Sequence, residues 1–453
     1  MKSKDDLYNK GPISFLPLAT FLIVYLGAGI FFSIIGISNP FKQVSREFAV
    51  LCGLLVVILL SRGPSILKAI DLDIDIVAKH CGESNCMLMI LIFTLAGAFS
   101  GAAAAMGGQT SAVNLGLTVI PQQYLFGGIF IISAFLATAM GTSMGTIAAI
   151  GPIALGLAQE AEISEAFAIA AVLGGAMFGD NLSIISDTTI AATRSAGCEM
   201  KDKFRMNLKI AFPAAILTIL FYCLIGSGGN VHSVYDYSYI NILPYVLVLI
   251  TALLGVNVIL VLMIGTICCG IIGMSTGALT IVTFSQAVTK GIGGMLSIII
   301  VTIIIRGLTG IAVEYKGLEW LVSKASRYMN SRGSAEMGMG LLTGLIDVSM
   351  GNNTIAILVS GPVAVRFAKL YNIAPKRVAS LLDIFACVFQ SYIPHGGQMM
   401  LCMALSGLSP IAIIEACYYP ALLLIATLIT IKFGLMKTKE ERERIKMYPE
   451  SDV

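Results

Sequence analysis

Apolar segments long enough to cross a lipid bilayer recur along the whole chain. They occupy residues 15–37, 87–106, 243–264, 295–313 and 411–431, with a shorter one at 210–225. A helix needs about 20 consecutive apolar residues to span the hydrocarbon core. Because a spanning helix satisfies its own backbone hydrogen bonds, the pattern predicts an all-α polytopic membrane protein.

Composition supports this prediction and excludes several other classes of protein. The chain is 57% hydrophobic and 12% charged, with a mean hydropathy of +0.88, whereas soluble domains carry roughly 25% charged residues. The net charge is +3 without a long basic cluster, so nucleic acid is not an expected partner. The ten cysteines are scattered without metal-ligand spacing, and no nucleophile motif indicates an enzyme or a cofactor.

The chain also resembles itself at a shift of 210 residues. Residues 140–163 and 350–373 share eight of 24 positions without a gap, including Gly151/Gly361 and Pro152/Pro362. The same shift pairs Gly97 with Gly307 and other small residues elsewhere. We interpret this as an internal repeat.

The charges of the loops indicate that the two repeats have opposite orientations. Loops 159–165, 404–416 and 107–124 contain no Lys or Arg, whereas their counterparts 366–377, 194–209 and 316–332 are basic. Cytoplasmic loops collect Lys and Arg, so the paired loops lie on opposite sides of the membrane. Inverted repeats are typical of secondary transporters.

These observations predict the organisation of the chain. Residues 1–225 form the first inverted repeat, 226–239 an external linker, 240–432 the second repeat and 433–453 a cytoplasmic tail. Segments 124–158 and 335–368 each start and end on one side, so each is either two full crossings or a re-entrant hairpin. With about five transmembrane helices and a hairpin per repeat, both termini are cytoplasmic.

A polar stretch interrupts the apolar pattern at residues 178–189. Its candidate ion ligands are Asp180, Asn181, Ser183, Ser186, Asp187, Thr188 and Thr189. We expect Gly179 to end one half-helix and Asp187 to begin the next. A carboxylate at a helix C-terminus is unfavourable without a cation, so Asp180 is expected to hold Na⁺ or a proton. Asp187 is either a second Na⁺ ligand or a helix N-cap.

The second repeat has a matching break at residues 389–398, where Pro394 cannot continue a helix. The shift pairs Asp180 and Asn181 with Gln390 and Ser391, which we take as further ligand candidates. His395 is either a proton carrier or a packed neutral histidine.

The turns at 140–143 and 350–353 carry more polar candidates. They are Thr142 and Ser143 in the first repeat, and Asn352, Asn353 and Thr354 in the second. Their oxygens suit an alkali cation or a small polar solute, although each side chain could instead cap a helix.

Two further acids interrupt apolar helices. Asp347 and Asp383 are paired by the shift with Ala137 and Leu173, so the repeat does not require them. A carboxyl group in such surroundings is a candidate proton carrier.

The motif Gly179-Asp180-Asn181-Leu182-Ser183, followed by Ser186-Asp187-Thr188-Thr189, resembles the signature of NhaC-type sodium/proton antiporters. The stretches 190–194 and 197–200 extend this resemblance. It implies the broader ion-transporter superfamily, with inverted repeats and paired re-entrant hairpins, and favours hairpins at both tips. The chain departs from the common motif at Ile184, where many members have proline, and at Asn181, where a lysine is frequent.

The expected function is therefore Na⁺/H⁺ antiport by alternating access, with both ions competing for carboxylates in the membrane. The alternative is a Na⁺- or H⁺-coupled transporter of a small amino acid or organic acid, since relatives include malate and lactate exchangers. Expected partners are membrane lipid, Na⁺ and H⁺, with a homodimer as a further expectation. By analogy, the location is a prokaryotic inner membrane.

Overall fold

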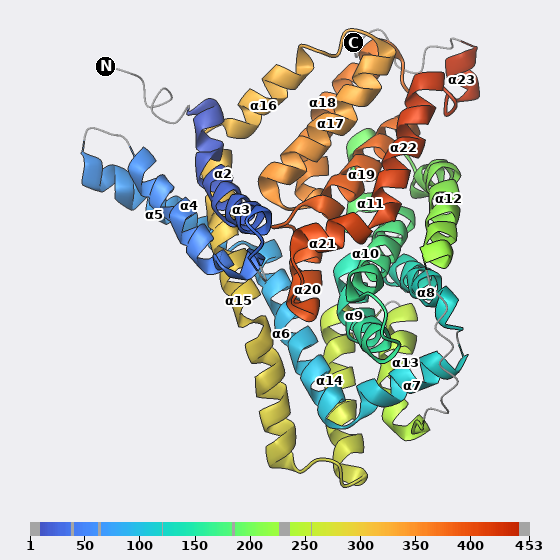
Figure 1. Ribbon diagram of the computed structural model, residues 1–453. Coiled ribbons are helices and arrows are strands. Elements are labelled where there is room, and N and C mark those ends of the chain that lie inside the picture. Colours follow the sequence, from blue (N-terminus) through green and yellow to red (C-terminus); the bar gives the residue numbers. More distant parts are fainter. Residues whose placement is uncertain are drawn as a thin grey trace.

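The computed structural model describes residues 10–37, 40–61, 65–119, 121–183, 186–225, 236–254 and 256–443. Regular structure in these ranges is helical throughout (Figure 1). Within these ranges, eight helices are long and apolar enough to cross a membrane, or nine if a pair bent by 56° is counted as one span. The prediction of an all-α polytopic membrane protein is confirmed.

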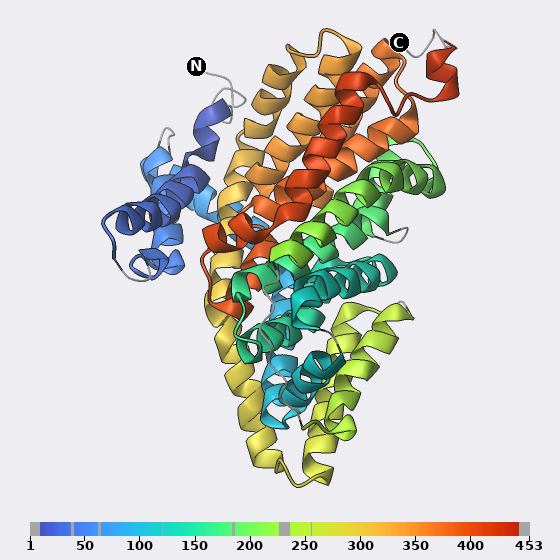
Figure 2. The same ribbon diagram turned by 45° about the vertical axis from the view of Figure 1, so that its right-hand side comes forward.

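The helices before residue 226 are α2 (Leu16–Leu22), α3 (Ala28–Ile34), α4 (Arg46–Leu60), α5 (Ile66–Cys81), α6 (Ser84–Ala105), α7 (Gly108–Val119), α8 (Leu125–Met140), α9 (Ser143–Glu160), α10 (Glu165–Leu182), α11 (Asp187–Ala196) and α12 (Met200–Ile225). Those after residue 235 are α13 (Tyr239–Leu253), α14 (Val258–Ser275), α15 (Ile281–Glu314), α16 (Gly317–Ser326), α17 (Arg332–Met350), α18 (Asn353–Tyr371), α19 (Pro375–Tyr392), α20 (Gly397–Ser406), α21 (Pro410–Ala416), α22 (Tyr418–Phe433) and α23 (Lys439–Arg442). Both views show α6 beside the long helix α15, with α7, α13 and α14 gathered at the lower end (Figures 1 and 2).

Helix boundaries recur at the shift found in the sequence. Helices α9, α10 and α11 begin at residues 143, 165 and 187, and α18, α19 and α20 begin at 353, 375 and 397. The packing recurs as well, because α9 contacts α10 and α20, while α18 contacts α19 and α11. Helix α9 of the first part therefore packs against α20 of the second, and α18 of the second part packs against α11 of the first.

Corresponding helix pairs in the two parts of the chain each pack a glycine of one helix against a phenylalanine of the other, but the helix that carries the glycine differs. A Cβ added to Gly175 of α10 would lie 2.4 Å from the carbonyl oxygen of Phe130 on α8. In the second part the glycine is Gly340 of α17, where an added Cβ would lie 2.3 Å from the ring of Phe385 on α19. Small residues let membrane helices approach closely. In each pair, the glycine on one helix therefore allows close contact with the other helix.

We expect Gly179→Val to destabilise the protein, because an added Cβ would lie 2.3 Å from the Ala137 Cβ and 2.4 Å from the Thr138 amide nitrogen. Helices α8 and α10 would have to separate, at about 1–3 kcal/mol for overpacking. Thermal unfolding in detergent measures the loss. Gly294→Val on α15 is the matched control, since nothing lies within 4 Å of its added Cβ, and equal melting of the two variants would contradict the expectation.

Two predicted spans differ from the structure. The apolar segment 243–264 is divided, because α13 ends at Leu253 and α14 begins at Val258, with Asn257 as its N-cap. The Asn257 side chain accepts a hydrogen bond from the Ile259 amide at 2.9 Å, which makes a new helix start favourable there. Segment 411–431 is also divided, into α21 and α22.

The predicted linker and tail lie partly outside the described residues. Residues 226–235 of the linker and 444–453 of the tail fall there. In the part that is described, Asn114 of α7 donates to the Asp236 carbonyl at 2.7 Å. At the start of the tail, Glu441 is buried and accepts from Arg332 at 2.7 Å, so this end of the chain packs against α17.

Candidate functional site

The two predicted turns at residues 140–143 and 350–353, called the tips below, are each a tight turn between two helices. Helix α8 ends at Met140, and the residue after it, Gly141, has a φ of 68° in the left-handed region. Helix α9 starts after the N-cap Thr142. In the second part, Gly351 has a φ of 61° and Asn352 is the N-cap of α18. Glycine adopts this backbone conformation without steric penalty. The capping interpretation thus holds for Thr142 and Asn352, and both tips direct a helix N-terminus at the same region.

Both breaks in the long helices also occur where the sequence places them, although their boundaries differ. Helix α10 continues to Leu182, so Gly179 does not end it. Ser186, rather than Asp187, is the N-cap of α11 and accepts from the Thr189 amide at 3.2 Å. Asp187 is therefore free of the capping role that we considered for it. In the second part, α19 ends at Tyr392 and α20 starts after Gly396.

The two tips and the two breaks surround one cavity of about 340 Å³. Nine predicted ligand candidates line it, namely Thr142, Ser143, Asp180, Asp187, Thr188, Asn352, Asn353, Thr354 and Gln390. The N-terminus of α14, at Asn257, and the side of α6, at Met89, complete the wall. Segments as far apart in the sequence as Leu88 and Gln398 thus contribute to a single polar space.

Asp180 is the more buried of the two carboxylates in this wall. It is 5% exposed, and its Oδ2 accepts from the Ser143 hydroxyl at 3.0 Å. Its backbone carbonyl accepts from the Ser186 hydroxyl at 3.0 Å, which ties the end of α10 to the start of α11. Asp187 is exposed at the first position of α11, where the helix dipole favours a negative charge.

A row of polar side chains leads from Asp180 across the cavity to the second break. The Gln398 amide nitrogen donates to Ser143 Oγ at 3.0 Å, and Gln390 donates to Gln398 Oε1 at 2.7 Å. The other side of the Gln390 amide lies 2.7 Å from Asp347 Oδ1. Asp347 is fully buried and does not line the cavity. The row connects carboxyl groups from the two parts of the chain.

A second polar cluster lies behind the first break and is centred on Lys203 of α12. Its ammonium group donates to the Asn181 carbonyl at 2.6 Å and to Thr189 Oγ1 at 2.6 Å, and it pairs with Asp383 Oδ2 at 2.7 Å. Asp383 Oδ2 also accepts from the Asn181 amide at 2.8 Å and the Asn207 amide at 2.9 Å. Lys203 and Asp383 are fully buried. The hydrogen bonds of Lys203 fix both half-helices of the break to α12, and its ion pair with Asp383 joins α12 to α19.

Comparison with known proteins identifies the family. A model of the Na⁺/H⁺ antiporter family matches residues 8–227 and 232–438. The chain belongs to this family. Membership makes it a secondary transporter rather than an enzyme, implies Na⁺ and H⁺ as transported ions and confirms the resemblance to NhaC-type proteins.

Individual relatives are distant. The chain is 23% identical over 354 residues to the Na⁺/H⁺ antiporter NhaC of Alkalihalophilus pseudofirmus, covering 71% of this chain and 76% of that protein. It is 29% identical over 153 residues to the malate-2H⁺/Na⁺-lactate antiporter of Bacillus subtilis, covering 33% of each. The YdaH transporter of Alcanivorax borkumensis is a similar solved structure, with a TM-score of 0.41 and 13% identity over 94% of this chain and 98% of that one.

The structure gives physical meaning to one departure from the family motif. The resemblance to NhaC-type proteins predicts a lysine at the position of Asn181, and the Lys203 ammonium group reaches the Asn181 carbonyl from the neighbouring helix. A cation is thus present beside the break, although the motif position is neutral. Lys203 was not among the predicted site residues because it falls in the basic loop 194–209. Arg377, counted in loop 366–377, is likewise buried and pairs with Glu336 at 2.9 Å.

The other predicted candidates lie away from the cavity. Ser391 donates to the Cys387 carbonyl of its own helix at 2.7 Å. The Ser183 carbonyl accepts from Thr189 Oγ1 at 2.7 Å. His395 is buried and donates from Nε2 to the Val348 carbonyl at 2.9 Å. The Thr189 contact joins the two sides of the first break, and the His395 contact joins the second break to α17 beside its tip.

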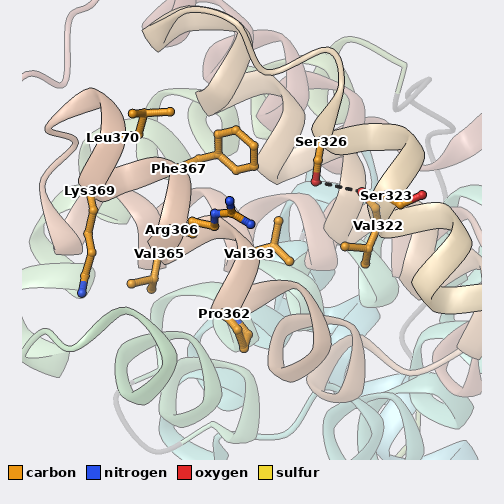
Figure 3. A pocket seen from close by; sticks show the side chains of 10 residues that line it. All are labelled: Val322, Ser323, Ser326, Pro362, Val363, Val365, Arg366, Phe367, Lys369 and Leu370. Atoms are coloured by element: carbon orange, nitrogen blue, oxygen red, sulfur yellow. Dashed lines mark hydrogen bonds between the residues drawn. The ribbon is translucent and has the colours of Figure 1, made fainter. Parts of the chain in front are cut away.

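A larger cavity, of about 760 Å³, lies between α16 and α18 (Figure 3). Its wall includes Ser323, Ser326, Arg366 and Lys369 and is otherwise apolar. Among the residues that the structure describes, this wall contributes no carboxylate, so it offers a cation no charged oxygen. The smaller cavity at the tips is the better candidate for Na⁺.

Proposed function

We propose that this protein exchanges Na⁺ for H⁺ at the cavity between the tips and breaks. The observation that carries the proposal is the position of Asp180 and Asp187, which face one polar cavity together with hydroxyl and amide oxygens of both tips. Such hard oxygen donors suit an alkali cation. Na⁺ is the transported substrate and would contact both carboxylates, with Ser143, Thr188 and Asn353 as neighbouring donors.

Exchange would follow from competition. A carboxyl group that carries a proton cannot also neutralise Na⁺, so Asp180 would hold one ion only after the other has left. Because Asp180 is almost fully buried, an unneutralised negative charge there is unfavourable. The empty, ionised site would therefore be the least stable state, which favours exchange over leakage.

Alternating access would arise from two inverted repeats with re-entrant hairpins. The recurrence of helix boundaries and the cross-packing of α9 on α20 and of α18 on α11 support this architecture. Rocking of one hairpin with its partner half-helix would open the cavity to one side, as in other transporters built from inverted repeats. The basic loops would place both termini in the cytoplasm of a prokaryotic cell.

Competition predicts a specific pH dependence. In proteoliposomes with a trapped pH-sensitive dye, addition of Na⁺ should move protons in the opposite direction. On the acid side of the optimum, where Asp180 is mostly protonated, the apparent Na⁺ affinity should fall about tenfold per pH unit, because one proton must leave for each Na⁺ bound. Affinity that does not change with pH on the acid side would contradict the competition.

Coupled transport of a small organic acid is the second candidate function. Helices α9, α11, α18 and α20 all direct their N-termini at the cavity, and helix N-termini favour anions. The cavity volume of about 340 Å³ is also in the range of small-ligand sites. Uptake of labelled malate, lactate or amino acids under a Na⁺ gradient tests this candidate. Accumulation without Na⁺-driven proton movement would favour it over antiport.

A further inference from the structure

The protonation state of Asp347 determines which side of the Gln390 amide, oxygen or nitrogen, can form a hydrogen bond with it. Its two sides face Asp347 Oδ1 and Gln398 Oε1, each at 2.7 Å. A protonated Asp347 can donate to the Gln390 oxygen. An ionised Asp347 can only accept, so the Gln390 nitrogen must turn toward it, where it lies 2.7 Å from Oδ1 and 3.2 Å from Oδ2.

The orientation of Gln390 determines that of every group beyond it. With Asp347 protonated, the Gln390 nitrogen donates to Gln398, Gln398 donates to Ser143 at 3.0 Å, and Ser143 donates to Asp180 at 3.0 Å. Gln390 then also donates to the Gly351 carbonyl at the second tip, at 3.4 Å. The row ends on Asp180 as an acceptor, which stabilises the ionised carboxylate.

With Asp347 ionised, the same row must run in the opposite direction. The Gln390 oxygen then faces Gln398, whose amide turns to donate to it. The Gln398 oxygen faces Ser143, and the serine hydroxyl donates to Gln398 instead of Asp180. Asp180 then keeps a hydrogen bond to Ser143 only by carrying a proton and donating it. Because these groups are buried, an orientation that leaves one unpaired is unfavourable.

We propose that Gln390, Gln398 and Ser143 form a directional hydrogen-bond relay through which protonation of Asp347 makes Asp180 ionised and receptive to Na⁺. This inference rests on the proposed antiport and assigns positioning roles to the two glutamines. No proton passes through the amides. The proton of Asp180 leaves through the cavity that this carboxyl group lines, and the relay transmits only the direction of hydrogen bonding.

Other charged or titratable groups surround the two ends of the relay. Near Asp347 these are Arg306 of α15, which donates to the Met350 carbonyl at 3.4 Å, and His395, which donates to the Val348 carbonyl. The groups that act on Asp180 are Asp187, Asp383 and Lys203, and Cys387 lies close to it. None of these side chains interrupts the row of contacts from Asp347 to Asp180.

The pH profile of Na⁺-driven proton movement tests the relay separately from the antiport. Competition at Asp180 weakens Na⁺ affinity toward acid pH, whereas reversal of the relay weakens it toward alkaline pH, where Asp347 loses its proton. We expect a loss of about tenfold on the alkaline side of the wild-type optimum, a usual size for coupling between linked groups. In Gln390→Met and Gln398→Met the alkaline loss should disappear, while the acid loss remains.

Two further variants sharpen the result. Asp347→Asn and the double variant Asp347→Asn/Gln398→Met should give the same flattened profile, because the first removes the titrating group and breaking the row as well adds nothing. Gln109→Met is the matched control, since Gln109 donates to the Pro152 carbonyl outside the relay, and its profile should equal that of the wild type.

Three results would overturn the relay: a wild type without alkaline loss, glutamine variants that retain it, or variants that weaken Na⁺ affinity equally at every pH. If the wild type instead lacks the acid loss, the competition at Asp180 itself is wrong.

Discussion

Asp180→Asn should abolish Na⁺-dependent proton movement in proteoliposomes. The substitution preserves the size of the side chain and its contact with Ser143, but it removes the only group at this position that can be either negatively charged or protonated. A neutral amide neither neutralises Na⁺ in the buried cavity nor releases a proton when Na⁺ arrives. Because Na⁺ and H⁺ both bind the Asp180 carboxyl group in the proposed mechanism, the variant should lose exchange completely at every pH.

The control for this prediction is Asp71→Asn, the same chemical change at an exposed position on α5. It should transport like the wild type. Asp180→Asn should melt at or above the wild-type temperature, since removal of a buried charge relieves a desolvation penalty. Asp71→Asn should melt like the wild type, because its side chain is exposed. Undiminished exchange in Asp180→Asn would refute the assignment of this carboxylate and direct attention to Asp187.

Local signals made the framework of the site predictable from the sequence. Proline, glycine and clustered polar residues within apolar runs are unusual in a membrane helix, and they mark the breaks near Ser183 and Pro394. The tips were predictable because Gly141 and Gly351 recur at the repeat shift and provide the left-handed residue that each turn needs. Boundaries were less predictable, since α10 could extend three residues past Gly179 without any change in the pattern.

Partners across the fold were not predictable in the same way. Nothing in the sequence near Lys203 distinguishes it from Lys201, yet one is fully buried against Asp383 and the other is exposed. The contribution of α14 to the cavity was hidden within a continuous apolar run, where Asn257 was the single signal of a helix start. The row from Asp347 to Asp180 depends on side chains from several helices, which only the tertiary packing brings together.

The buried ion pair leads to the last prediction. Lys203→Met should destabilise the protein by about 3–5 kcal/mol, because it leaves Asp383 as a buried charge without its counter-ion. The Asn181 carbonyl and the Thr189 hydroxyl would also each lose the 2.6 Å hydrogen bond from Lys203. Since the lost contacts join both half-helices of the first break to α12, the break should loosen as the protein loses stability.

A second substitution should recover part of this loss. In Lys203→Met/Asp383→Asn the buried charge is absent, and the introduced amide oxygen can still accept from the amides of Asn181 and Asn207, so the double variant should melt at a higher temperature than Lys203→Met. Thermal unfolding in detergent measures both effects, and Lys201→Met, an exposed change two residues away on the same helix, should melt like the wild type. If Lys203→Met also melts like the wild type, the ion pair does not hold the break in place. If the double variant is no more stable than Lys203→Met, the loss comes from the hydrogen bonds that Lys203 donates to Asn181 and Thr189 rather than from the isolated charge.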